Sequence, residues 1–416
     1  MPDMRTVATS LAEAAADTDT SWAAVLLVTA AGVVSAFQFG KPSVALAALE
    51  QSLGADIGSA SWLLSAFALV GALLGLWIGL RVDAWGARRM LLAGLATQAA
   101  ASALGGLAPS FPWLLGSRAL EGVGFLAVAV AGPALVHMAT SARDRDRAFA
   151  VWGTFMPVGM GALMIVAPQL QALGWRGLWL ANAGLLAACA LLFTVSTRRL
   201  RALAGGALAA EPRGWAPSRA PGLRQVLALP APWLVAGLFV TFSAMFFSVF
   251  TFLPSILSER LGVGQESIGS LSAIAVAMSA VGTLACGVLL GRVGALPLLV
   301  FGFVVMGGAS PAVLLPSLPA GLSYAAALLV SLVSGLVPVI LFAAAARHAP
   351  APSQVGVTMG MAMQGNNLGL LAGPAAAGAI VARWDWPSVA AWVGLLGLIA
   401  LVLVRLLRSS RAPVAI

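Results

Sequence analysis

The stretch GLRVDAWGARR, residues 79–89, is the segment around which the rest of the chain is organised. It places one acid, Asp83, and three arginines between two long apolar runs, in a segment too short to form a domain. Because charge at this density does not stay in hydrocarbon, we expect a tight polar turn between two membrane helices. Gly79 and Gly86 flank the acid and allow the close backbone approach that such a turn requires.

The composition of the whole chain is that of an integral membrane protein. Of its 416 residues, 60% are hydrophobic and 9% are charged, with a mean hydropathy of +0.98, whereas about 25% of the residues in a soluble domain are charged. The arginines behind the net charge of +9 lie in short segments beside apolar runs, so we expect no nucleic-acid partner. Cys189 and Cys286 lie inside apolar runs and indicate neither a disulfide framework nor a metal site.

Twelve apolar runs have the length of about 20 residues that a membrane helix needs. They lie near residues 22–49, 60–80, 90–107, 112–138, 148–173, 176–195, 232–257, 267–290, 295–315, 321–346, 355–381 and 388–407. Residues 197–230, rich in Arg, Pro and Gly, are predicted to form a linker. We therefore expect an all-α membrane protein with two pseudo-symmetric six-helix bundles, at residues 22–196 and 231–407, between tails at residues 1–21 and 408–416.

The distribution of the arginines predicts the orientation in the membrane. Only Arg176, Arg260 and Arg383 fall in loops on the outer side of the twelve-helix arrangement, while most of the others fall on the opposite side. By the positive-inside rule, both termini are expected in the cytoplasm, in a multi-pass protein of the inner (plasma) membrane. The first 20 residues lack the pattern of a signal peptide, so the first helix is expected to direct insertion.

The two halves of the chain also repeat weakly. Gly287, Gly291, Arg292 and Gly294 fall where the first half has Gly79, Asp83, Ala84 and Gly86, with the acid lost. A repeat of this kind is typical of a transporter in which one half rocks against the other around a central site.

The pattern Gly79, Asp83, Gly86, Arg88 and Arg89 resembles the loop between helices 2 and 3 of the major facilitator superfamily of secondary transporters. Ala84 and Ala87 stand where family members often carry further basic residues. The resemblance implies a twelve-helix fold with alternating access. We expect these five residues to act as a conformational switch, because Asp83 can reach the positive N-terminal end of the eleventh helix and hold the two halves together there.

A second motif supports the same family. Arg118, Glu121, Gly122 and Gly124 resemble the family's helix 4 motif, which implies a buried arginine linked to substrate binding or proton coupling. The fifth helix matches the family's antiporter signature poorly, since Met156 and Met160 replace expected glycines. Antiport is therefore not favoured by this signature.

Three ionisable residues lie deep within the predicted helices, where each needs a partner, an aqueous cavity or a function. They are Lys41, which is the sole lysine, together with Arg118 and Glu121. Lys41 and Arg118 are expected at similar depth, facing one cavity, and Glu121 lies one turn from Arg118 on the same helix face. This arrangement predicts that the two cations bind an anionic substrate and that Glu121 carries a proton. The alternatives are an ion pair that merely ties helices together and a Lys41 side chain that reaches the outer surface.

Polar and aromatic residues elsewhere complete the predicted substrate site. Gln364, Asn366 and Asn367 of the eleventh helix fall near mid-membrane, where amides either bridge helices or line a cavity. Phe37 and Trp152 are candidates for the wall of the site, with packing as the alternative. Gly365, Gly369, Gly373 and Pro374 are expected to let this helix bend.

The sequence shows no phosphate-binding glycine loop after a strand, no paired metal ligands and no nucleophile with a base. We therefore expect neither an enzyme nor a cofactor. The expected function is secondary active transport of a small organic or inorganic anion, moved together with a proton, by a monomer in the lipid bilayer. The first alternative is a proton-coupled exporter of hydrophobic or cationic compounds that uses Glu121. A sensor is a further alternative, but the longest loop is the linker, which is too short for a signalling domain.

Overall fold

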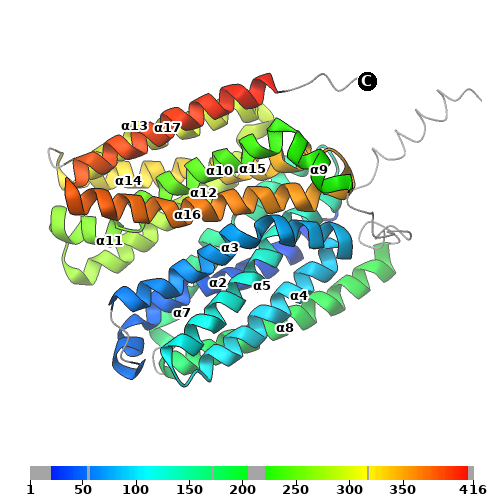
Figure 1. Cartoon of the computed structure of the whole chain (residues 1–416), viewed down its shortest axis with the longest axis horizontal. Coiled ribbons are helices and arrows are strands. Elements are labelled where there is room, and N and C mark those ends of the chain that lie inside the picture. Colours follow the sequence, from blue (N-terminus) through cyan, green and yellow to red (C-terminus); the bar gives the residue numbers. More distant parts are fainter. Residues whose placement is uncertain (1–19, 54–56, 171–172, 205–220, 316–317, 411–416) are drawn as a thin grey trace, which may run out of the picture.

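The computed structural model describes residues 20–53, 57–170, 173–204, 221–315 and 318–410. Every regular element within these ranges is a helix, so the predicted all-α class is confirmed. Nine helical segments of the described chain are long and apolar enough to cross a membrane. Figure 1 shows that the helices lie side by side in two groups, which follow one another in the sequence.

The first group contains the helices of the N-terminal half. They are α2 (Trp22–Leu53), α3 (Ile57–Trp85), α4 (Ala87–Gly106), α5 (Phe111–Met138), α6 (Arg145–Gly153), α7 (Phe155–Leu170) and α8 (Gly174–Ala204). α6 and α7 follow one another almost directly, as one helix interrupted at Thr154.

The second group contains the helices of the C-terminal half. They are α10 (Pro230–Phe250), α11 (Leu253–Ser255), η2 (Ile256–Arg260), α12 (Gln265–Val293), α13 (Ala295–Leu314), α14 (Ala320–Ser334), α15 (Leu336–Arg347), η3 (Pro352–Gln354), α16 (Val355–Arg383) and α17 (Trp386–Ser409). Between the groups, the short helix α9 (Pro221–Ala228) falls within the predicted linker, of which residues 205–220 lie outside the described ranges.

All twelve predicted apolar runs coincide with one of these helices or with two or three consecutive ones. α4, the α6–α7 pair and α16 are not among the nine segments that are long and apolar enough to cross a membrane. The total of twelve membrane helices and the two bundle boundaries therefore stay predictions.

The tight turn predicted over residues 79–89 is much shorter in the structure, because residues 79–85 belong to α3 and residues 87–89 to α4, which leaves only Gly86 outside a helix. α3 ends at Trp85 and α4 begins at Ala87, and Gly86 between them has φ 88°, a value that L side chains rarely adopt. Gly294 separates α12 from α13 in the same way, with φ 87°. The repeat seen in the sequence therefore extends to the backbone conformation of these two turns.

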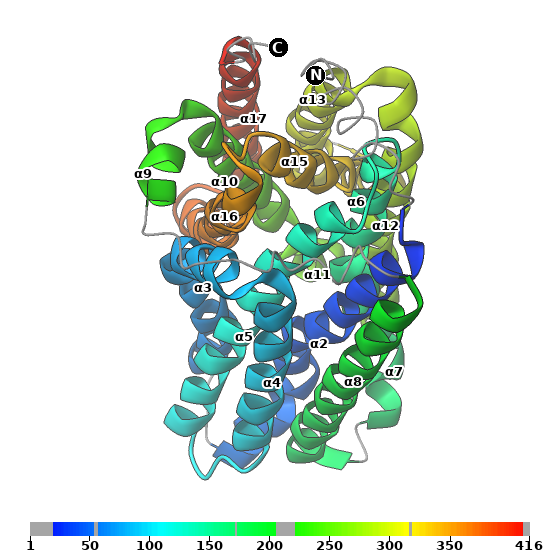
Figure 2. The same cartoon turned by 90° about the vertical axis from the view of Figure 1, so that its right-hand side faces the viewer.

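The connections α3–α4, α5–α6, α12–α13 and α15–α16 meet at one end of the molecule, which we call the inner end. In Figure 2, α6 of the first group lies next to α15 of the second at the place where the groups meet. α9 also lies at this end, where Val226 is buried against Val357 and Met361 of α16. In Figure 1 the inner end is on the right, beside α9.

Glycines bring α3 and α16 into direct backbone contact across the two groups. Gly71, Gly75 and Gly79 on α3 recur every four residues and face Gly356, Gly360 and the amides of α16. A Cβ atom added at Gly75 would lie 2.6 Å from the carbonyl oxygen of Gly360, which no real side chain does. Small residues at four-residue spacing are the usual means by which membrane helices approach this closely.

A second set of glycines on α16 packs against its own half. Gly365, Gly369 and Gly373 lie against the backbone of α10 at Ala236, Val240 and Ala244. The helix runs without interruption from Val355 to Arg383, with Pro374 inside it. In this structure the three glycines therefore serve close packing between α16 and α10, and the bending of this helix during a conformational change stays a prediction.

Candidate transport site

The three ionisable residues predicted to lie deep in the membrane form one buried cluster. Nζ of Lys41, on α2, lies 2.7 Å from Oε1 of Glu121, on α5. A guanidinium nitrogen of Arg118 donates to the other carboxylate oxygen of Glu121. All three side chains are fully buried, so the alternative in which Lys41 reaches the outer surface is wrong.

The neighbouring helices supply further partners for the two cations. Lys41 donates to Oγ of Ser102 on α4 at 2.8 Å, and Ser102 donates to the carbonyl oxygen of Trp179 on α8. The ammonium group also lies 4.6 Å from the centre of the Trp179 ring, within the range of a cation–π contact. The Arg118 guanidinium lies over the ring of Phe67 and donates to the carbonyl oxygen of Leu63, both on α3.

The charges within this cluster do not cancel. One carboxylate accepts from two cations, so the group carries a net charge of about +1 with both bases protonated, and removing such charge from water costs several kcal/mol per ion. Nη2 of Arg118 is buried and has no hydrogen-bond partner among the described residues. The cluster therefore carries one uncompensated positive charge, and Arg118 has one N–H group without a partner among the described residues.

The expectation of an anionic substrate finds no support in this geometry. It required Lys41 and Arg118 to face a common aqueous cavity, but both side chains are fully buried and both are bound to Glu121. A buried cation that is already bound to a carboxylate is less available to an anion that enters from water. The sequence shows which charged residues lie within the apolar runs, but it does not show which of them pair with one another.

Two further buried polar pairs lie near the cluster. Ser35 donates to the side chain of Gln98, and Gln38 donates to the side chain of Asn182, each at 3.0 Å. Ser35, Gln38 and Lys41 are three residues apart on α2, so they lie on one face of the helix. That spacing of polar residues within an apolar run was the available sequence signal.

The aromatic candidates lie in packed surroundings. Trp152 is fully buried, stacks on Phe155 with 4.5 Å between ring centres, and fits against Gly32 and Gly132. Phe37 is half-buried and packs against a cluster that includes Trp175 and Trp179. Their role in substrate binding stays a prediction, and the packing alternative is the better description of Trp152 in this conformation.

The three amides of α16 point in different directions. Gln364 donates to the carbonyl oxygen of Ala72 on α3 at 2.8 Å, and Asn367 packs against Gly71 of the same helix. Asn366 instead accepts from Oγ of Ser243 on α10. Two amides therefore lie between the two halves, and the third holds α16 to its own half.

The predicted contact of Asp83 with the eleventh helix is confirmed. Its carboxylate accepts hydrogen bonds from the backbone N–H groups of Gly356 and Val357, at 2.7 and 2.8 Å. Arg88 donates to Thr197 on α8, within the first group, and Arg89 is exposed. Gly79 lies against Gly356. The action of these residues as a switch stays a prediction.

A second polar contact joins the halves at the inner end. Asp146 on α6 lies 3.5 Å from Arg347 on α15, and both side chains are partly exposed. Burial, followed by the neighbouring Arg347, lowers the pKa of Arg145, and Asp146 partly offsets these effects. The inner end is therefore rich in positive charge, with Asp146 as the acid between Arg145 and Arg347.

Comparison with known proteins agrees with the architecture. Residues 28–363 match the family model of the Major Facilitator Superfamily. The structure is similar to that of the proton:xylose symporter XylE, with a TM-score of 0.71 over 91% of this chain and 94% of that one. At 16% sequence identity, this similarity concerns the fold.

Curated relatives come from resistance and export systems. The chloramphenicol resistance protein of Streptomyces lividans is 31% identical over 78% of this chain and 81% of its own length. The puromycin resistance protein pur8 of Streptomyces alboniger is 30% identical, and the cephamycin export protein CmcT of Amycolatopsis lactamdurans 31% identical, but the matches span only 37% and 34% of those proteins. The family match and the fold together establish that this chain belongs to the Major Facilitator Superfamily of membrane transporters.

Proposed function

We propose that the protein is a proton-coupled exporter of hydrophobic or cationic compounds. The observation that carries this proposal is the match to a chloramphenicol resistance protein along most of both chains. The burial of Lys41 and Arg118 supports it, because both cations are bound to Glu121 and, in the described part of the chain, do not face a cavity in which an anion could bind. With the arginine-rich segments in the cytoplasm, the protein would lie in the inner membrane with its inner end facing the cytoplasm.

We place proton coupling in the cluster of Lys41, Glu121 and Arg118. Glu121 is held between two cations, each of which donates to one of its carboxylate oxygens. An arginine does not release its proton in proteins, so the proton that can leave at least cost is the one on Lys41. Its loss would leave a neutral cluster, namely the Arg118–Glu121 pair beside a neutral amine. In this proposal Glu121 holds the protonated amine of Lys41 in place, and Lys41 releases and takes up the proton.

Alternating access would open and close the contacts between the halves at the inner end. These contacts are the Asp83 hydrogen bonds, the glycine packing of α3 on α16, and the Asp146–Arg347 ion pair. They close the cytoplasmic side, so the conformation described here would release substrate outward. Loss of a proton from the cluster, which lies beside α3 through Leu63 and Phe67, would bias the equilibrium between the two forms.

Transport into inside-out vesicles tests this function. An imposed pH gradient, acidic inside, is expected to drive uptake of a fluorescent hydrophobic cation and of chloramphenicol, and uptake should stop when a protonophore collapses the gradient. Parallel assays with radiolabelled phosphate, acetate and benzoate are expected to show no protein-dependent flux. Gradient-driven anion transport without uptake of either test compound would refute the proposal.

A further inference from the structure

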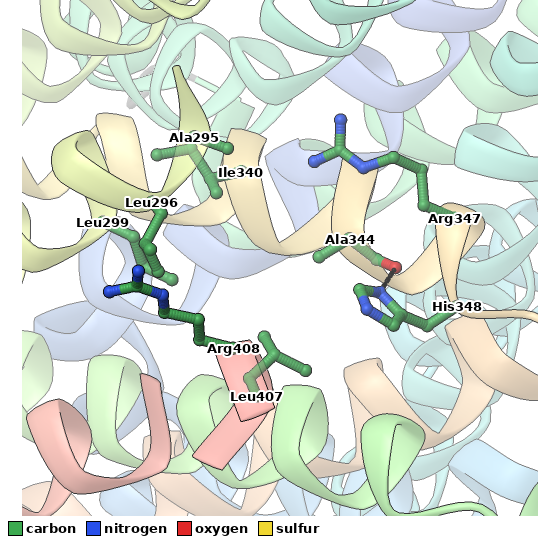
Figure 3. Close-up of a pocket in the computed structure, with 9 residues that line it drawn as sticks. All are labelled: Ala295, Leu296, Leu299, Ile340, Ala344, Arg347, His348, Leu407 and Arg408. Atoms are coloured by element: carbon green, nitrogen blue, oxygen red, sulfur yellow. Dashed lines mark hydrogen bonds between the residues drawn. The ribbon is translucent and has the colours of Figure 1, made fainter. Parts of the chain in front are cut away.

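A pocket lies at the inner end of the C-terminal half, between the first turn of α13 and the last turns of α15 and α17 (Figure 3). Its apolar lining includes Leu296, Leu299, Ile340 and Leu407. The pocket belongs to a different half of the molecule from the charged cluster around Glu121. It is therefore separate from the proposed proton site.

Positive charge surrounds this pocket. Arg347 and Arg408 line it from α15 and α17, and His348 lies beside Arg347 with its ring hydrogen-bonded to the carbonyl oxygen of Ala344 (Figure 3). Arg408 forms no ion pair with any acid in the part of the chain that the structure describes. The first turn of α13 also reaches the pocket, with no side-chain cap on its N–H groups, so the helix dipole adds to the positive potential.

The helices that form the pocket also carry exposed apolar residues. Val402 and Leu406 on α17 are 58% and 47% exposed, and Phe301 on α13 is 50% exposed. In a membrane protein such residues mark the surface that faces the acyl chains. The pocket therefore offers cations to the headgroup of a ligand, and the exposed apolar residues of the same helices offer a surface to its acyl chains.

We propose that the pocket binds the phosphate group of an anionic lipid from the cytoplasmic leaflet, held by Arg408 and Arg347. Basic pockets between membrane helices on the cytoplasmic side are suited to such headgroups. Arg347 is shared, because it also pairs with Asp146 across the two halves. A bound phosphate competes with Asp146 for this guanidinium, so the lipid weakens one of the contacts that close the inner end.

The test uses the full-length protein in detergent, titrated with phosphatidylglycerol or phosphatidylcholine and followed by native mass spectrometry. Phosphatidylglycerol is expected to bind more tightly. Arg408→Gln and Arg347→Gln should each weaken its binding about fivefold, the effect of one basic residue near a lipid headgroup. Arg405→Gln is the matched control, since Arg405 is exposed on the same helix but does not line the pocket.

Three results would overturn the proposal: equal binding of the two lipids, an equal loss in the Arg405→Gln control, or no loss in either pocket variant. Competition with inorganic phosphate or glycerol phosphate distinguishes a lipid headgroup from a soluble phosphate as the ligand of the pocket. Displacement of phosphatidylglycerol by either compound at millimolar concentration would identify a site for soluble phosphate and exclude the lipid. Asp146→Asn is expected to strengthen lipid binding by releasing Arg347, and unchanged binding would remove the link to the inner end.

Discussion

The carboxylate of Asp83 accepts a hydrogen bond of 2.7 Å from the backbone N–H of Gly356, and so joins the last turn of α3 to the first turn of α16 in the other half. It accepts a second bond from Val357. These are the N–H groups that a capping side chain normally satisfies at the start of a helix, and α16 has no side-chain cap of its own and no acid in its first turn. Asp83 therefore caps a helix of the opposite half.

Removal of this cap should favour opening of the inner end. Asp83→Ala loses both hydrogen bonds, and an unsatisfied buried partner costs about 1–3 kcal/mol. Ala150 is buried at the contact of α6 with α12, so Ala150→Cys, in a background without Cys189 and Cys286, reports the opening. We expect faster labelling of this cysteine by a maleimide in Asp83→Ala.

Asp144→Asn serves as the control for this experiment, because Asp144 contacts only Arg147 of its own helix segment, at 3.9 Å, among the described ion pairs. Its labelling rate should match that of the parent. Equal rates in the parent and in Asp83→Ala would show that the cap does not set the balance between the two forms.

Substitution of a glycine on α3 should favour opening of the inner end, as substitution of Asp83 does. A Cβ at Gly75 would meet the backbone of α16, which cannot move aside without separating the halves. Overpacking of this kind costs about 1–3 kcal/mol, so Gly75→Ala is expected to increase labelling of Ala150→Cys. Gly184→Ala is the matched control, since nothing lies within 4 Å of the added atom. Similar labelling of both variants would contradict the close packing of α3 on α16.

Substitutions of Glu121 and Lys41 should affect the stability of the protein differently, because they leave different net charges in the cluster. Glu121→Gln leaves two buried cations without an acid and is expected to lower stability by about 3–5 kcal/mol. Lys41→Met leaves the Arg118–Glu121 pair neutral, so the melting temperature should fall much less. Thermal unfolding in detergent measures both effects. A Lys41→Met variant that is less stable than Glu121→Gln would contradict the charge balance described above.

Transport by the Lys41→Met variant then tests the role of the proton. Binding and exchange of substrate between the two sides should persist, while accumulation driven by a pH gradient should be lost. Vesicles loaded with unlabelled substrate measure exchange, and vesicles under an imposed gradient measure accumulation. Full accumulation by Lys41→Met would place the exchanged proton elsewhere.

The orientation in the membrane follows from the arginine distribution alone. Reporter fusions after Arg201 and after Leu407 are both expected to report the cytoplasm, since most arginines lie on that side of the twelve-helix arrangement. A periplasmic reporter signal from either fusion would disprove the twelve-helix topology.

The sequence by itself determined the helices and the turn at Gly86. Each depends on local chemistry: apolar runs of spanning length form helices, and a glycine between two helices permits the positive φ that the turn needs. The depth of Lys41, Arg118 and Glu121 could be predicted for the same reason, because position within an apolar run sets depth in the membrane.

Tertiary structure alone decided which of these groups contact each other. Lys41 and Glu121 are 80 residues apart, and only the packing of α2 on α5 brings them to 2.7 Å, so that Glu121 binds Lys41 as well as Arg118. In the same way, Gly75 and Gly360 meet because two distant helices cross. A sequence fixes the face on which each side chain lies, but pairing between distant helices depends on how those faces pack, and so cations that look available in the sequence are bound to an acid in the fold.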